Sequence, residues 1–227
     1  MSFHDVTVVE NRLVADDHHH LTLDPGHPDL LGGYTIPGQF VQLRLGEDKP
    51  GFFAIASAPG QDTLEFLVQR GGGVSAALCA LEPGATVAMS APMGKGFDVT
   101  RLAGRDALLF ATGSGISAVR SVIESRSWGG HRATLFYGAR TPARMAWQDH
   151  FDDWRARGLT VVPVISRPEG TGWTGKTGYV QHAYRDAPYP TVNDAVAVLC
   201  GVKGMVEEIT AMLIGAGLHE DHVLMNY

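Results

Sequence analysis

The sequence predicts two domains: an antiparallel β-barrel over residues 1–102, followed by an α/β domain with a doubly wound parallel sheet over residues 103–227. Three observations predict this fold class. The first hundred residues contain short strand-like runs separated by Gly, Pro and Asp, and after about residue 104 apolar strands alternate with helical patterns. The length of 227 residues suffices for one large domain or two small ones and easily buries a core.

The elements of the first half are predicted from short apolar runs and the turn residues between them. The strand-like runs are VTVVENRLV, HHLTLD, GQFVQLRL, FFAIASAP and TLEFLVQR. Strands at such short spacing are typical of an antiparallel barrel or sandwich. One helix is expected at about Ser75 to Leu81, and a further strand near Ala85 to Met89.

The elements of the second half alternate in type. Apolar strands are expected in ALLFATG, RATLFYG, LTVVPVIS, AVAVLCG and HVLMNY, and helices in ISAVRSVIESR, across Met145 to Arg157 and across Met205 to Gly215. Short apolar strands that alternate with helices indicate a parallel sheet with both faces covered. The boundary between the domains is expected near Thr100 to Gly104.

Charge and cysteine content argue against several functions. The net charge of −6 disfavours a nucleic-acid surface. Cys79 and Cys200 form no CxxC pair, so they cannot build an iron–sulfur cluster held by four cysteines, and both are expected to stay reduced. The N-terminus has no basic segment before an apolar one, and no apolar run approaches the roughly 18 residues of a membrane span. We therefore expect a cytoplasmic protein without a membrane span.

Three consecutive histidines, His18, His19 and His20, are candidates for a metal site. Alternate residues of a strand point to opposite faces, so the three imidazoles are not expected to converge on one ion. We expect histidines on a strand surface and no metal.

A glycine turn opens the α/β half. Gly113, Ser114, Gly115 and Ile116 begin a G-x-G-x-x-A pattern directly after the first parallel strand. Glycines permit a tight turn and a close backbone approach, and the helix that follows directs free N–H groups at a phosphate. The alternative is a plain strand-to-helix turn, but the position after the first strand favours a dinucleotide site.

A second glycine run lies in the barrel half. Gly72, Gly73, Val74 and Ser75 belong to GGGVSAAL, which opens the predicted helix. Ser75 is expected either to cap this helix or to hold a pyrophosphate together with nearby N–H groups; the alternative is a flexible hairpin loop. Two dinucleotide cradles in different domains predict hydride transfer between a flavin and a nicotinamide.

The order of the motifs resembles the ferredoxin–NADP reductase superfamily over almost the entire chain. The motifs are PGQF, FAIAS, LVQRGGGVS, ATGSGISAV, FYGAR, ISRPEG with GYVQ, CGVKGM and a terminal aromatic. The resemblance implies a barrel that binds FAD, with FMN as a possible substitute, and an α/β domain that binds NADP(H) or NAD(H). Within the superfamily, the closer likeness is to small plant and bacterial reductase-like proteins.

The flavin strand departs from the pattern of the family. There the strand carries Arg-x-Tyr-Ser, in which the arginine neutralises pyrophosphate, the aromatic stacks on the flavin and the serine reaches its reactive nitrogen. The matching positions are Gly51, Phe53 and Ala54. Loss of a charge-assisted contact costs about 1.5–3 kcal/mol, or one to two decades of affinity. Arg70 is the candidate for the missing charge, and the alternative is a protein that kept the fold and lost the flavin.

Further residues of the motifs are implied by the resemblance to contact the flavin. They are Ile55, Ala56, Val68, Gln69, Gly72, Gly73, Val74 and Ser75. Tyr227, the last residue, is expected to lie over the flavin as a lid that the nicotinamide displaces, and the alternative is a frayed terminus.

The nicotinamide is expected to be NADP(H) rather than NAD(H). No acidic residue follows the second strand of the α/β half, which ends at Arg140. Ser166 and Arg167, at the end of the third strand, resemble the Ser-Arg pair that holds the 2′-phosphate in the family, and a guanidinium suits phosphate bidentately. The alternative is a simple turn at Arg167.

The fourth strand ends in a segment that the resemblance places beside the nicotinamide. Gly201 and Met205 continue the CGxxxM pattern, and the Cys200 sulfur is expected near the reacting carbon. The alternative for Cys200 is plain core filling. The predicted function is a flavin-dependent NAD(P)H oxidoreductase that exchanges electrons with a separate carrier protein or a small-molecule acceptor. The alternative is a non-catalytic nucleotide-binding or regulatory protein on the same scaffold.

Overall fold

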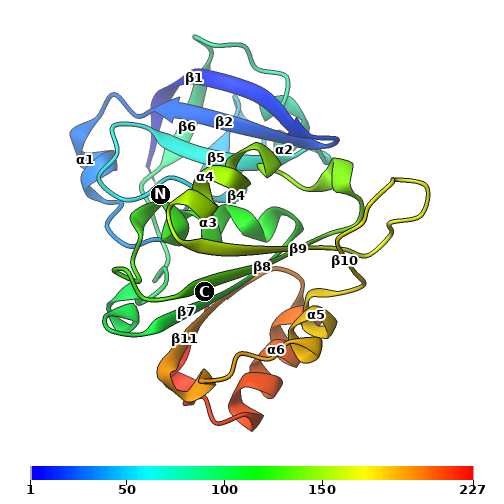
Figure 1. The fold of residues 1–227 in the computed structure, drawn as a ribbon. Helices are drawn as coiled ribbons and strands as arrows, with labels where there is room; N and C mark the ends of the chain where they lie inside the picture. Colours follow the sequence, from blue (N-terminus) through cyan, green and yellow to red (C-terminus); the bar gives the residue numbers. More distant parts are fainter. Residues whose placement is uncertain (1, 227) are drawn as a thin grey trace.

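The computed structural model describes residues 2–226 and has two sheets, one above the other in Figure 1. The N-terminal sheet is antiparallel with the order β4-β3-β6-β1-β2-β5, and the C-terminal sheet is parallel with the order β10-β9-β8-β7-β11-β12. The predicted fold class, an antiparallel barrel followed by a doubly wound α/β domain, is confirmed.

The barrel is formed by strands that enclose one hydrophobic core. The strands are β1 (Phe3–Ala15), β2 (His18–Asp24), β3 (Phe40–Arg44), β4 (Gly51–Ala54), β5 (Leu64–Gln69) and β6 (Thr86–Ser90), with the short helices α1 (Pro28–Gly32) and α2 (Val74–Leu78). Strands β4 and β5 are the two edges of the sheet, and the isolated bridge between Ile55 and Phe66 joins them. Both of these side chains are fully buried in the barrel core.

The α/β domain has helices on both faces of its sheet (Figure 1). Its elements are β7 (Asp106–Thr112), α3 (Ile116–Ser125), β8 (Ala133–Ala139), α4 (Phe151–Ala156), β9 (Leu159–Ile165), β10 (Lys176–Thr177), α5 (Val180–Asp186), β11 (Ala195–Cys200), α6 (Lys203–Gly215) and β12 (Val223–Leu224). The chain order reverses at β7, which lies between β8 and β11. Such a switch point leaves a crevice at the carboxyl ends of the strands.

Helices α3 and α4 lie between the parallel sheet and the barrel, whereas α5 and α6 cover the outer face (Figure 1). The core around α3 extends into the barrel, where it includes Ala56 and Leu67. The barrel sheet ends at Ser90 and the parallel sheet begins at Asp106. The predicted division between residues 102 and 103 falls in this connection.

The helix predicted across Met145 to Arg157 is wrong in its first half, because α4 begins only at Phe151. Trp147 has a left-handed backbone, with a φ of 58°. The Ala146 N–H donates to the Tyr137 hydroxyl at 3.1 Å, and the Trp147 indole N–H donates to His20 at 3.0 Å. The left-handed backbone at Trp147 interrupts the predicted helix, and the two tertiary bonds hold this segment in place.

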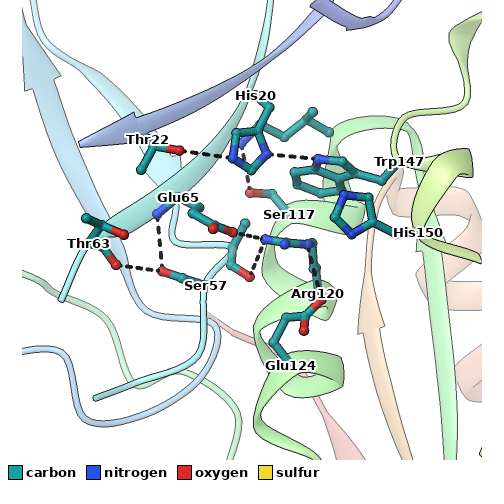
Figure 2. Close-up of polar contacts among 12 residues, drawn as sticks. His20, Thr22, Ser57, Thr63, Glu65, Ser117, Arg120, Glu124, Trp147 and His150 are labelled. Carbon is teal, nitrogen blue, oxygen red and sulfur yellow. Dashed lines mark hydrogen bonds and ion pairs between the residues drawn. The ribbon is translucent and has the colours of Figure 1, made fainter. Parts of the chain in front are cut away.

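Arg120 joins the two domains. It projects from α3, is 5% exposed, and makes an ion pair with Glu65 of the barrel (Figure 2). Its guanidinium also donates to the Ala56 carbonyl at 3.3 Å and lies 4.7 Å from the centre of the Trp147 ring. Glu124, one turn along α3, lies 3.4 Å from it. A buried charge needs such partners, so the ion pair fixes α3 against the barrel.

The three histidines at residues 18–20 are buried, with exposed fractions of 3%, 8% and 4%, so the expectation of surface histidines is wrong. The α/β domain covers the barrel at β2, where Trp147 contacts His20. His20 accepts from Trp147 through Nδ1, so its proton lies on Nε2, which donates to Thr22 at 3.0 Å (Figure 2). His19 contacts Asn11 at 2.9 Å and Arg70 at 3.0 Å.

We predict that His20 makes the stability of the protein depend on pH. Burial lowers the pKa of His20 to about 4, although Glu65 opposes this shift. The folded protein keeps His20 neutral, whereas the unfolded chain binds a proton near pH 6.5, so stability falls as the pH drops from about 6.5 to 4. The wild type should lose on the order of 2–3 kcal/mol more than His20→Gln between pH 7 and pH 4.5. Urea unfolding at both pH values measures this, and equal losses would contradict it.

Candidate nucleotide-binding cleft between the two domains

A cleft with a volume of about 640 Å³ lies between the barrel and the α/β domain. This volume falls in the range of small-molecule and cofactor sites. The barrel lines it with residues of β4 and β5, and the α/β domain lines it with the turns that follow β7 and β11. The principal lining residues are Phe53, Ala54, Leu67, Gln69, Gly113, Ser114, Gly115, Ser117, Cys200 and Gly201.

The glycine turn of residues 113–115 connects β7 to α3 at the switch point of the sheet. Gly113 has a φ of 53°, a left-handed conformation that favours glycine. A Cβ at Gly115 would lie 2.5 Å from the Cys200 carbonyl oxygen, so only glycine lets the two turns meet. Ile116 is buried and begins α3, whose free N–H groups face the turn. The arrangement suits an anionic group such as a phosphate.

The turn after β11 packs against the end of β7. A Cβ at Gly201 would collide with the Thr112 hydroxyl, which accepts a hydrogen bond from the Val202 N–H at 2.9 Å. Cys200 lines the cleft, and burial raises the pKa of its thiol to about 11, so the thiol stays protonated at neutral pH. Met205 is 2% exposed and lines a neighbouring cavity instead.

The predicted flavin strand presents one half-buried and one exposed aromatic. The Phe53 ring packs against the barrel core, and a Cβ on Gly51 would lie 2.9 Å from it and 2.9 Å from Val74. Any side chain at residue 51 would therefore press on these two side chains. Phe52 is 65% exposed and lies against Phe40, with ring centres 5.7 Å apart.

Several predicted flavin residues belong to the cores rather than to the cleft surface. Ile55, Ala56, Val68 and Val74 are buried and do not line the cleft. Ala54 and Gln69 line the cleft, and the Gln69 amide donates to Asp17 at 3.0 Å.

The glycine run of the barrel forms an exposed loop, and a Cβ at Gly72 or Gly73 would meet no atom within 4 Å. Ser75 lies inside the first turn of α2 and does not cap it, so this part of the prediction is wrong. Its hydroxyl accepts from the Gly71 N–H at 3.2 Å and donates to the Gly72 carbonyl at 3.1 Å. The serine thereby closes the loop upon itself.

The positive charge of the cleft does not come from Arg70, which is held outside it by the bond to His19. Arg140 and Arg144 line the cleft, and among its described lining residues none is acidic. Arg144 lies 3.5 Å from Asp17, which also contacts His18 at 2.8 Å. Sequence reasoning missed Arg144 and His18, because no motif singles out either residue for the cleft.

A second cavity of about 420 Å³ adjoins the cleft on the α/β domain. It is lined by Arg140, Ser166 and Arg167, which the sequence predicted, and by Tyr179, which it did not. The Arg167 N–H donates to the Arg140 carbonyl at 2.7 Å, so the two residues are adjacent. Neither guanidinium forms an ion pair with another residue of the described range 2–226. Two unpaired guanidinium groups favour a phosphate ligand.

The sequence also led to expectations about a metal site, a membrane span and Tyr227. Within residues 2–226, no group of His, Cys, Asp and Glu side chains is arranged to hold a metal ion. None of the helices described is long and apolar enough to cross a bilayer. Tyr227, predicted to cover the flavin, lies outside the described residues.

Comparisons with known proteins agree with this architecture. The family model of the oxidoreductase NAD-binding domain matches residues 109–211. Fruit protein pKIWI502 of Actinidia deliciosa is 36% identical over 216 residues, which cover 87% of this chain and 68% of that protein. Ferredoxin–NADP reductase B of Sorangium cellulosum is 33% identical over 205 residues, which cover 82% of each chain.

Among solved structures, a ferredoxin NADP+ reductase from Neisseria gonorrhoeae with bound FAD and NADP has the same fold. The TM-score is 0.79 at 19% identity, and the match covers 96% of this chain and 92% of that one. The fold, the cleft between the two sheets and the similarity to Ferredoxin–NADP reductase B lead to one conclusion. The chain belongs to the ferredoxin–NADP reductase superfamily of FAD/NAD(P)-binding oxidoreductases.

Proposed function

We propose that this protein is a flavin-dependent NAD(P)H oxidoreductase that passes hydride between NADP(H) and FAD. The observation that carries the proposal is the single cleft lined from one side by β4 and β5 and from the other by the turns after β7 and β11. Two nucleotides bound to these two walls would bring their reactive rings together. Holding two reactants in one geometry accounts for much of the catalysis of such a reaction.

The residues of the cleft fit a flat ring. Phe53, Ala54 and Leu67 provide an apolar wall, and the small side chain of Ala54 lets a ring approach the backbone. The exposed backbone of Gly72 and Gly73 would contact the phosphates of FAD, while the Ser75 hydroxyl would hold the shape of this loop. FMN would need only the ring site and one phosphate contact. A bound flavin would supply the site that accepts hydride, while this chain would bind it, orient it and exclude water.

NADP(H) is our proposed nicotinamide. Gly113, Ser114 and Gly115 would hold its pyrophosphate, and the unpaired Arg140 and Arg167 beside Ser166 would hold its 2′-phosphate. Cys200 and Gly201 would lie beside the nicotinamide ring. Since the chain has two cysteines that are far apart, electrons would leave to a separate carrier protein or a small-molecule acceptor.

A second candidate function is a non-catalytic nucleotide-binding or regulatory protein. The specific observation in its favour is that Gly51 stands where the family has an arginine, with Phe53 and Val74 packed so closely that even a Cβ there would lie 2.9 Å from each. In this case the α/β domain would still bind NADP(H), whereas the barrel would bind flavin weakly or not at all.

The absorption spectrum distinguishes the two functions. We expect the protein titrated with FAD to show the bands of a bound flavin, and we expect NADPH to bleach them under anaerobic conditions. FMN in the same titration tests which flavin is preferred. A protein that binds NADP(H) but takes up neither flavin would support the non-catalytic alternative.

We predict that Arg144, and not Arg70, supplies a phosphate contact in the cleft. Arg144→Gln should weaken binding of flavin or nicotinamide nucleotide about 10- to 100-fold, because it removes a charge-assisted bond worth about 1.5–3 kcal/mol. Arg70→Gln is the matched control and should change either affinity by less than about threefold. Calorimetric titration of each nucleotide into each variant shows which phosphate is bound, and a larger loss in Arg70→Gln would contradict the assignment.

Arg167 is predicted to select NADPH over NADH. Arg167→Leu should raise the KM for NADPH about 10- to 100-fold through loss of a phosphate contact, while the KM for NADH stays within about twofold. Steady-state reduction of a dye acceptor measures both constants in one preparation. A wild-type preference for NADH would overturn the choice of NADP(H).

A further inference from the structure

The seam between β4 and β5 is bridged by a side chain of the other domain. The Ser117 hydroxyl donates to the Ala54 carbonyl of β4 at 2.8 Å and accepts from the Leu67 N–H of β5 at 3.4 Å. Ser117 is 3% exposed and projects from α3 toward the barrel (Figure 2). One hydroxyl thus contacts both barrel strands that line the cleft.

Ser117 also belongs to the first turn of the helix that begins at the glycine turn. Two residues before it, Gly115 packs so closely on the Cys200 carbonyl that a Cβ would lie 2.5 Å from this oxygen. The wall made by Cys200 and Gly201 is therefore joined to the wall made by Ala54 and Leu67 through three residues of α3 and its turn. Only Ile116 lies between Gly115 and Ser117 in the chain.

We infer that Ser117 is a positioning residue that sets the approach of the nicotinamide to the flavin. This inference rests on the proposed function. A hydride donor and acceptor must come within about 3–3.5 Å in an aligned geometry, and a displacement of about 1 Å can cost 100-fold in rate. The Ser117 hydroxyl fixes the positions of β4 and β5 relative to the start of α3. Its removal therefore lets the two walls of the cleft shift relative to each other.

Ser121 provides a matched control on the same helix. Its hydroxyl accepts from the Gly38 N–H of the barrel at 2.8 Å, and its side chain is fully buried. Gly38 is not among the residues that line the cleft. Loss of this hydroxyl removes a domain contact of the same kind without touching the wall of the cleft.

The experiment compares Ser117→Ala with Ser121→Ala in flavin-loaded protein. Stopped-flow reduction by NADPH should be about 10- to 100-fold slower in Ser117→Ala, while the Kd for NADPH stays within about threefold. The long-wavelength absorbance that reports contact between nicotinamide and flavin should weaken in parallel. Ser121→Ala should keep the wild-type rate and absorbance, although urea unfolding should show a comparable loss of stability in both variants.

The outcomes separate the inference from the proposed function. A wild type that binds no flavin or is not reduced by NADPH removes the proposed function itself. A reducible wild type whose two variants react alike, or whose Ser117→Ala loses rate and NADPH affinity together, overturns the role of Ser117. Should Ser117→Ala not fold, Ser117→Cys retains the size and a weaker donor; an intermediate rate supports the inference, and a wild-type rate overturns it.

Discussion

Arg120 brings a positive charge into the junction between the two domains, and the geometry of the cleft depends on how that charge is satisfied. Glu65 of the barrel and Glu124 of its own helix lie beside it, and the Trp147 ring lies under it. Removing Arg120 would leave the carboxylates of Glu65 and Glu124 without their buried partner in a low-dielectric environment. The domains are therefore held in one relative orientation, rather than joined loosely by a linker.

Helix α3 transmits this constraint to the site. Its first turn follows the glycine cradle, its buried face carries Ser117, Arg120 and Ser121 to the barrel, and its other contacts continue the core of the α/β domain. The proposed hydride transfer needs such a rigid element, because the two reacting groups would be held by different domains. Here the same ten-residue helix forms part of the proposed nucleotide site and of the junction between the domains.

Much of this organisation could be predicted from the sequence, because it follows from periodicity and from glycine chemistry. Apolar strands alternating with helices identified the parallel sheet, and GSG after the first of them identified the turn at Gly113. The errors have tertiary causes. The left-handed backbone of Trp147 interrupts the helix that local propensity favours, and His20 is buried because another domain covers its strand. Arg144 reaches the cleft through domain packing, which local patterns do not encode.

The packing of Phe53 and Val74 over Gly51 limits which side chains fit at residue 51. An arginine introduced at residue 51 alone would bring its Cβ to 2.9 Å from both neighbours, so these side chains would have to move. Shortening Phe53 or Val74 would make room for a larger side chain there, but without that side chain it would leave a void. Residues 51, 53 and 74 thus form one packing unit, in which a change at one position constrains the side chains that fit at the other two.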